Sequence, residues 1–279
     1  MTTWYRTAIL ALAALIGMWA TVAQADDTTL LGSGQTPPPE GTITRTPPVP
    51  VIDFPDAIPM HNMSIASDGT FYYTSNGGNA GYGQINTYNL SGVLQHSTPC
   101  YLDMRAIFWN FADSHLYAKA YGGDLYRVDP ASGATTLIHS GIFAYAQSSP
   151  ALSLDGQTLI EHESGTVRFI SFQTGQLIST LTGFYFGSYP SNETVGVSCN
   201  WIFTWDGTMV HVYDFAGNPV ESYTIPNGHY GFSLKFVNGL LFASDDGGGA
   251  TGHWYGYDVG AAPSPTEPAT WGEVKGLFR

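Results

Sequence analysis

The sequence predicts an all-β fold, a β-propeller of five four-stranded blades closed by an N-terminal strand, and three observations predict it. A turn motif, in which a hydrophobic strand runs into Asp, Asn or Ser and then glycine, occurs five times. Its polar residues are spaced by 40, 42, 43 and 44 residues, which is the period of a propeller blade. No long window has the three- and four-residue apolar spacing of a helix. The polar residues of the motif are Asn89, Asp129, Ser171, Asp214 and Asp258.

Residues 1–25 are predicted to be a signal peptide. Arg6 gives a positive start, residues 8–20 form a short apolar run, and Ala23 and Ala25 fit a cleavage site. A membrane anchor is the alternative, but the apolar run is shorter than a bilayer span. Residues 26–48 are then a Pro-rich linker. We expect a protein that is secreted, periplasmic or on the cell surface.

Residues 49–260 are predicted to hold the propeller, with blades at about 60–98, 102–140, 147–182, 192–225 and 230–259. Asp-Gly pairs at 68–69 and 155–156 indicate the first hairpins of two blades. The last blade has three strands, and the strand at 49–54 has no blade of its own. Because a closed ring leaves no open strand edge, we expect the first strand to complete the last blade. Six blades are the alternative.

The bulk composition disfavours some classes of binding partner. The net charge is −13 with only nine Lys and Arg, which disfavours nucleic-acid binding. No apolar segment after residue 25 is long enough to span a membrane, and we expect a monomer. Cys100 and Cys199 lie on different blades and opposite rims of the predicted ring, too far apart for a disulfide. We therefore predict two unpaired, mostly buried thiols.

Two segments carry a resemblance to a known superfamily. Residues 126–133, Tyr-Arg-Val-Asp-Pro-Ala-Ser-Gly, and residues 169–175, Phe-Ile-Ser-Phe-Gln-Thr-Gly, resemble the repeats of secreted bacterial propellers of the YVTN-like and quinoprotein-like (WD40-like) superfamily. The resemblance covers about residues 60–260. It implies the fold and carries over no catalytic residue. It also suggests a quinone, but no residue here demands that cofactor.

In the predicted ring, the connections between blades and the loops between second and third strands share one rim, which is rich in aromatic residues. A glycan-binding surface uses flat aromatic rings and a few convergent polar groups. Packing between blades is the alternative role for the same rings. The predicted ligand-binding residues are Tyr101, Tyr145, Tyr185, Tyr189, Trp205, His229 and Tyr230.

Carboxylates on the same rim are also compatible with an enzyme. Glycoside hydrolysis needs two carboxyl groups, one with a raised pKa, and no other catalytic motif is present. Asp245 and Asp246, beside three glycines, are a weak candidate for Ca²⁺, with a solvated acidic turn as the alternative. The sequence requires no cofactor. The candidate catalytic residues are Asp103, Glu161, Glu163, Asp206 and Asp245.

We therefore expect an exported binding or scaffold propeller whose aromatic rim recognises a glycan or a protein partner. A polysaccharide-active hydrolase or lyase that uses the rim carboxylates is the alternative, and a purely structural surface module is a third hypothesis. Binding predicts partly exposed rim aromatics. Catalysis predicts a deep pocket with two facing carboxylates. Residues 261–279 are a second Pro-rich linker and a short tail.

Overall fold

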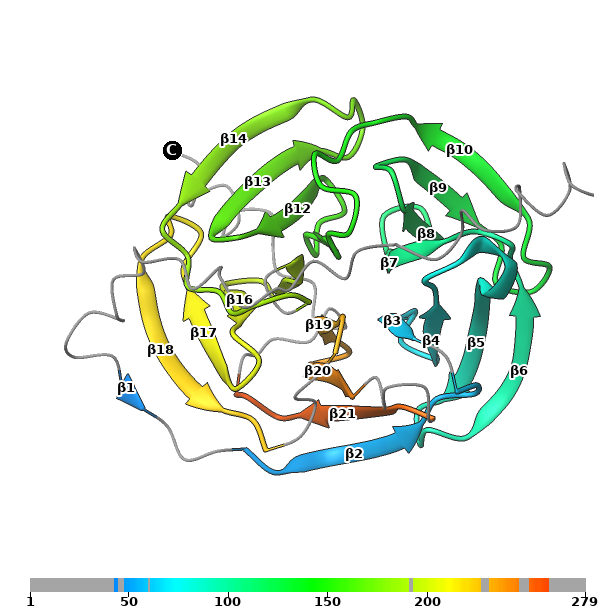
Figure 1. Ribbon diagram of the computed structural model, residues 1–279, viewed down its shortest axis with the longest axis horizontal. Coiled ribbons are helices and arrows are strands. Elements are labelled where there is room, and N and C mark those ends of the chain that lie inside the picture. Colours follow the sequence, from blue (N-terminus) through cyan, green and yellow to red (C-terminus); the bar gives the residue numbers. More distant parts are fainter. Residues whose placement is uncertain are drawn as a thin grey trace, which may run out of the picture. The chain divides into compact units, whose positions relative to one another are not determined.

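The computed structural model describes residues 43–44, 48–59, 61–190, 193–226, 231–245 and 251–260. All of them belong to the unit Thr36–Arg279. The predicted signal peptide, most of the linker and the C-terminal segment 261–279 lie outside the described residues. The described residues form five sheets around a common axis, so the prediction of an all-β, five-bladed propeller is confirmed (Figure 1).

Each blade has four antiparallel strands that follow one another from the axis outward. Blade 1 consists of β3 (Asn62–Ser67), β4 (Phe71–Asn76), β5 (Gln84–Asn89) and β6 (Leu94–Pro99). Blade 2 consists of β7 (Met104–Asn110), β8 (His115–Ala120), β9 (Leu125–Val128) and β10 (Thr135–His139). Blade 3 consists of β11 (Ala151–Leu152), β12 (Thr158–Glu163), β13 (Thr166–Ser171) and β14 (Leu177–Thr182). Blade 4 consists of β15 (Gly196–Val197), β16 (Ile202–Trp205), β17 (Met209–Tyr213) and β18 (Pro219–Thr224).

Blade 5 is closed by the N-terminal strand, as predicted. It consists of β19 (Leu234–Val237), β20 (Leu240–Asp245), β21 (His253–Tyr257) and, on its outer side, β2 (Pro50–Pro55). In the antiparallel pairing of β2 with β21, Phe54 lies opposite Trp254. One strand was not predicted, because β1 (Ile43–Thr44) falls in the expected linker and pairs in parallel with the outer edge of β18. A short 3-10 turn is present at Ala80–Tyr82.

A buried carboxylate joins the closing strand to its neighbours. Asp56, directly after β2, accepts hydrogen bonds from six donors that belong to its own backbone, blade 1 and blade 5. Burial raises the pKa of Asp56, and several of these hydrogen bonds oppose the shift. Closure therefore depends on a polar network as well as on strand pairing. The donors are Ala57 N (2.7 Å), Thr74 Oγ1 (3.1 Å), Asn76 Nδ2 (3.2 Å), Asn86 Nδ2 (3.2 Å), Tyr88 OH (3.0 Å) and Trp254 Nε1 (3.2 Å).

Hydrophobic side chains fill the spaces between neighbouring blades. Between blades 5 and 1 the core contains Phe54, Tyr72 and Trp254, all buried. The predicted Asp-Gly hairpins are present, with φ of +88° at Gly69 and +71° at Gly156, a backbone conformation that favours glycine. Within the described ranges, no helix is long and apolar enough to cross a membrane.

The repeated motif is a structural turn. In every copy the polar side chain accepts a hydrogen bond from a backbone N–H two or three residues later, where the third strand ends. Asn89 and Asp214, for example, accept from Ser91 N and Ala216 N at 3.0 and 2.9 Å. These Asx-type turns explain why Asp, Asn or Ser recurs there. The others pair Asp129 with Ala131 N, Ser171 with Thr174 N and Asp258 with Gly260 N.

Neither Cys100 nor Cys199 forms a disulfide, as predicted. Cys100 is buried, and burial raises its pKa to about 11. Cys199 is only partly buried. Cys100 therefore behaves as a small core residue rather than a reactive thiol.

Candidate functional site

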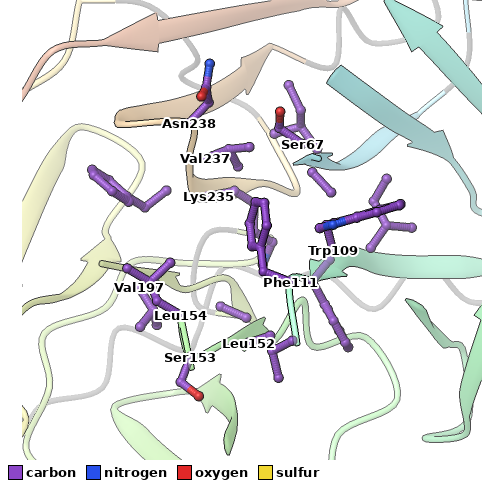
Figure 2. Close-up of a pocket in the computed structure, with 16 residues that line it drawn as sticks. Ser67, Trp109, Phe111, Leu152, Ser153, Leu154, Val197, Lys235, Val237 and Asn238 are labelled. Atoms are coloured by element: carbon purple, nitrogen blue, oxygen red, sulfur yellow. The ribbon is translucent and has the colours of Figure 1, made fainter. Parts of the chain in front are cut away.

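The two rims of the propeller differ in chemistry. The rim of the first and third turns of each blade, here the hairpin rim, has a cavity of about 60 Å³ on the axis (Figure 2). All five inner strands line it, and its side chains include Trp109, Phe111, Leu154 and Val237. A cavity of about 150 Å³ is needed to hold a molecule of benzene, so this one is too small for a sugar ring.

The opposite rim, here the connection rim, carries the inter-blade connections and the loops between second and third strands. The inner strands of blades 3 and 4 have only two residues each, against six and seven in blades 1 and 2. The backbone of the segments leading into them, 144–150 and 193–195, therefore finds few partners in a strand ladder. Buried backbone groups still need partners, and charged side chains provide them.

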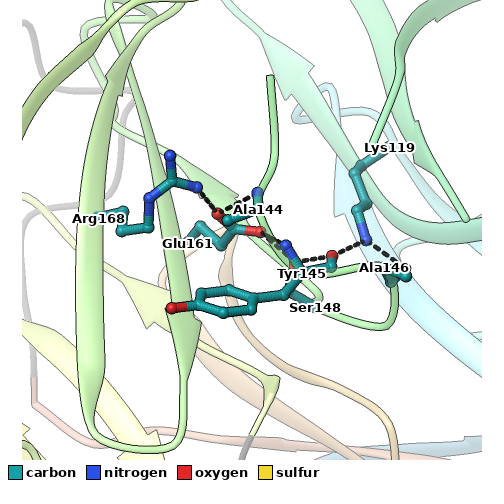
Figure 3. Close-up of polar contacts among 7 residues, drawn as sticks. All are labelled: Lys119, Ala144, Tyr145, Ala146, Ser148, Glu161 and Arg168. Atoms are coloured by element: carbon teal, nitrogen blue, oxygen red, sulfur yellow. Dashed lines mark hydrogen bonds and ion pairs between the residues drawn. The ribbon is translucent and has the colours of Figure 1, made fainter. Parts of the chain in front are cut away.

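Two charged side chains from second strands hold the connection between blades 2 and 3 (Figure 3). Glu161 of β12 accepts hydrogen bonds from Ala144 N and Tyr145 N, both at 3.1 Å, and from Ser148 Oγ at 2.6 Å. Its remaining partner is Arg168, in an ion pair. Lys119 of β8 donates to the carbonyl oxygens of Tyr145 and Ala146 at 2.8 and 2.6 Å. Glu161 and Lys119 therefore satisfy the backbone N–H groups and the carbonyl oxygens of the same connection.

Lys235 of β19 makes the corresponding contacts across the axis. Its ammonium group donates to the carbonyl oxygens of Ser149, Pro150 and Val195 at 2.6, 2.9 and 3.1 Å. Blade 5 is thereby joined to blades 3 and 4 at the centre of the ring. Burial lowers the pKa of Lys235, whereas its three carbonyl partners favour the charged form.

Beside these contacts lies a group of side chains that we call the axial cluster, consisting of Arg105, Lys119, Gln147, Ser149 and Glu193. Ser149 N donates to the carbonyl oxygen of Glu193 at 2.7 Å, and the charges of Arg105 and Lys119 act on the Glu193 carboxyl. Four buried atoms of the cluster have no hydrogen-bond partner among the described residues. They are Arg105 Nε, Gln147 Oε1, Ser149 Oγ and Glu193 Oε2.

The electrostatics of the axial cluster are unusual for this protein. Burial, followed by the negative charge of Glu163, raises the pKa of Glu193 to about 7, although Lys119 and Arg105 oppose the shift. Burial also lowers the pKa of Lys119 to about 7, with Glu161 opposing. Both groups thus change charge near neutral pH. Perturbed pKa values of this kind concentrate at functional sites.

Cations gather around this centre. The described residues contain five Lys and Arg. Only Arg127 lies elsewhere, and the other four are Arg105, Lys119, Arg168 and Lys235. In a chain of net charge −13, the axial end of the connection rim is therefore the place where ligand oxygens would meet positive charge.

Exposed aromatic rings lie on the connection rim as well. Tyr101, Tyr121 and Tyr189 are 73%, 53% and 41% exposed, and the Arg105 guanidinium lies 5.0 Å from the centre of the Tyr121 ring. Tyr145 is half-buried, and Tyr185 packs its ring 4.5 Å from that of His211.

Two of the predicted site residues have structural roles. Trp205 is completely buried in the core between blades 4 and 5, so its ring offers no face to a ligand on the rim. Glu161 is also fully buried, and both its oxygens are occupied. His229, Tyr230 and Asp246 lie outside the described residues.

The remaining predicted carboxylates keep local contacts. Asp103 accepts from Gly78 N and Arg105, at 3.1 and 3.0 Å, and Glu163 accepts from Ser164 Oγ. Burial acts to raise the pKa of Asp206, but bonds from His211, Met209 and Thr208 outweigh it and lower the pKa. Asp245 lies opposite His253 in the β20–β21 pair. Among the described residues, no group of three or more His, Cys, Asp or Glu is arranged to hold a metal ion.

Sequence reasoning missed the axial cluster. Lys119 lies near the end of a second strand, at a position where β12, β16 and β20 carry Glu161, Thr204 and Ser244. Glu193 is the first charged residue after Arg168. A charged residue near the end of a second strand, and a single acid after a long uncharged stretch, were the available signals.

Comparisons with known proteins add little. No family model matches the chain, and a search of curated proteins finds no match. Among solved structures, apo AztD from Citrobacter koseri is similar with a TM-score of 0.34 and 13% sequence identity. The match covers 60% of this chain and 47% of AztD, so the chain spans about half the length of that protein. A similarity of this size supports no inference about function.

Proposed function

We propose that this protein is an exported recognition module that binds a polyhydroxylated ligand, a glycan, at the axial end of the connection rim. The observation that carries the proposal is the axial cluster, in which four buried polar atoms have no partner among the described residues. Buried polar groups in folded proteins are paired with protein, water or ligand. Four such atoms in one place favour a site that takes up hydroxyl groups.

The donor and acceptor types suit a sugar. Glu193 Oε2 and Gln147 Oε1 accept hydrogen bonds, Arg105 Nε donates, and Ser149 Oγ does either. Exposed Tyr101, Tyr121 and Tyr189 on the same rim provide flat faces for the apolar side of sugar rings. The contacts of Lys119 and Glu161 fix the 144–149 segment before any ligand arrives, so little conformational entropy remains to be lost on binding.

A pull-down with insoluble polysaccharides tests the proposal, with reducing ends measured in the same tubes. We expect one or more polysaccharides to retain the protein without release of reducing ends. Tyr101→Ala and Tyr189→Ala are expected to weaken retention, because both rings are exposed on the connection rim. Phe111→Ala is the matched control, because Phe111 is also exposed but lies on the hairpin rim. Retention of the wild type by no polysaccharide would contradict the proposal and favour a protein partner.

A second function is favoured by one observation, the raised pKa of Glu193 beside the charge of Glu163. A carboxyl group that stays protonated near pH 7 is what a glycosidase uses as its general acid. In that case reducing ends would appear in the pull-down tubes. Glu193→Gln and Glu163→Gln would each abolish their release while the protein is still retained.

A further inference from the structure

The outer strands of the five blades, β2, β6, β10, β14 and β18, follow the circumference of the propeller (Figure 1). An open strand edge pairs readily with another chain, and natural proteins blunt it with proline, charge or a covering segment. A bulge or irregularity is present where the outer strand of every blade pairs with the third strand. Bulges therefore do not distinguish one edge from another.

Four of the five edges carry a further blunting feature. The β18 edge contains Pro219 and Glu221 and is paired with β1. The β2 edge contains two prolines and Asp53, and the β6 edge ends in Pro99. The β10 edge is short and ends at His139, whose ring contacts the Phe172 carbonyl of blade 3 at 2.9 Å.

The edge of β14 has none of these features. Its six residues, Leu-Ile-Ser-Thr-Leu-Thr, include no proline and no ionisable side chain. From residue 169 to residue 192 the chain has no Asp, Glu, Lys or Arg. Leu177 and Ile178 are 53% and 60% exposed, and among the described residues β13 is the only strand that pairs with β14.

We propose that the outer edge of β14 binds an extended peptide segment of a partner protein, which adds to blade 3 as a fifth strand. This interaction surface is separate from the axial cluster and does not depend on the proposed glycan binding. Main-chain hydrogen bonds hold the added strand, and the exposed Leu177 and Ile178 contact its apolar side chains.

The chain itself contains an example of such an added strand. On the next blade, β1 adds in parallel to the outer strand β18, with Ile43 opposite Glu221 and Thr44 opposite Ser222. This pairing indicates that the outer edge of a blade in this ring accepts a fifth strand. The residues of β1 are β-branched and uncharged, a composition that favours extended backbone.

Charge decides the chemistry of the partner. The net charge of −13 repels an acidic segment, whereas the uncharged stretch around β14 offers no specific cation to bind one. The segment that fits is therefore uncharged or basic and rich in β-branched residues. A second copy of this chain is disfavoured as the occupant, because two molecules of charge −13 repel each other.

Fluorescence anisotropy with a labelled peptide tests the proposal. The probe is the peptide of residues 41–46, Gly-Thr-Ile-Thr-Arg-Thr, which contains the β1 sequence and one basic residue. We expect saturable binding to the full chain, weakened roughly tenfold when lysines are placed on the edge by Ile178→Lys with Ser179→Lys. A peptide with Glu in place of Thr44 and Arg45 is expected to bind at least roughly tenfold more weakly.

The matched control places lysines on another outer strand, with Leu94→Lys and Gln95→Lys in β6, and is expected to bind like the wild type. Circular dichroism and thermal unfolding show whether each variant keeps the fold. No binding, or equal binding by the folded β14 variant, would overturn the proposal. So would a concentration-dependent dimer that the β14 variant fails to form, because the occupant would then be a second copy.

Discussion

Glu161 and Glu193 lie close to each other in the ring, yet their carboxyl groups are in opposite situations. Glu161 is fully buried with three hydrogen-bond donors and an arginine, so both its oxygens are engaged in holding the connection between blades 2 and 3. Glu193 has one oxygen with no partner among the described residues and a pKa of about 7. The first carboxylate therefore has a structural role, and the second has an oxygen that could accept a further hydrogen bond.

Removing the charge of Glu161 is expected to destabilise the fold. Glu161→Gln leaves Arg168 without its ion-pair partner and gives the loop a donor where it needs an acceptor. Breaking a buried pair in this way costs about 3–5 kcal/mol. Urea unfolding measures the loss. The control is Glu163→Gln, which changes the free energy of unfolding by roughly 0.5 kcal/mol or less. Equal effects of the two variants would contradict the structural assignment of Glu161.

Glu193→Gln is expected to stabilise the fold, more at pH 8 than at pH 5. The pKa of Glu193 is raised from 4.5 to about 7 in the folded protein. The stability linked to this group is therefore present below pH 4.5 and is lost as pH rises through 7. Gln never ionises, so the variant avoids that loss. Unfolding at the two pH values measures the difference, and a uniform destabilisation at both would contradict it.

His162 is expected to make the fold sensitive to mild acid. Nδ1 lies 3.1 Å from the Thr194 carbonyl, and Nε2 accepts from Gly165 N, a pattern that only the neutral ring satisfies. Burial lowers its pKa from 6.5 to about 4. Stability is therefore lost as pH falls from 6.5 to 4, on the order of 3 kcal/mol. In urea unfolding His162→Gln should lose less over this range, and an unchanged slope would contradict the assignment.

At the scale of strands, the sequence predicts the hairpins better than it predicts the lengths of the inner strands. Asp68-Gly69 and Asp155-Gly156 mark real turns, because positive φ strongly favours glycine. The two-residue strands β11 and β15 were not foreseen, because their short ladders are compensated by Lys119, Glu161 and Lys235 from other strands. Contacts of this kind depend on the closed ring, and no local sequence pattern predicts them.

Ring closure by β2 is expected to depend on Asp56. Asp56→Ala leaves the buried Trp254 Nε1 without its acceptor and removes one acceptor each from Asn76 and Asn86, and an orphaned buried donor costs about 1–3 kcal/mol. We expect a loss of several kcal/mol in urea unfolding and easier proteolysis of the N-terminal strand. Asp53→Ala, an exposed residue on the same strand, is the control and should unfold like the wild type. Equal stability of the two variants would show that strand pairing alone closes the ring.

For the whole molecule, the fold and the site differ in how far the sequence predicts them. The fold is repeated, so the turn residues Asn89, Asp129, Ser171, Asp214 and Asp258 give its period directly. The axial cluster is not repeated. Arg105 and Lys119 come from blade 2 and Glu193 from the connection between blades 3 and 4, with no shared spacing, and they meet only because five blades close around one axis. The rim was therefore predictable as a surface, whereas the particular side chains were not.

The central claim is that the ligand binds at the axial cluster, and calorimetric titration with the glycan retained in the pull-down tests it most directly. Wild type, Glu193→Gln and Asp53→Asn are compared at pH 7. Loss of a hydrogen bond to a charged group costs about 1.5–3 kcal/mol, so Glu193→Gln is predicted to bind at least roughly tenfold more weakly, with Asp53→Asn unchanged. If the glycan binds the folded Glu193→Gln protein as tightly as the wild type, the ligand does not bind at the axial cluster.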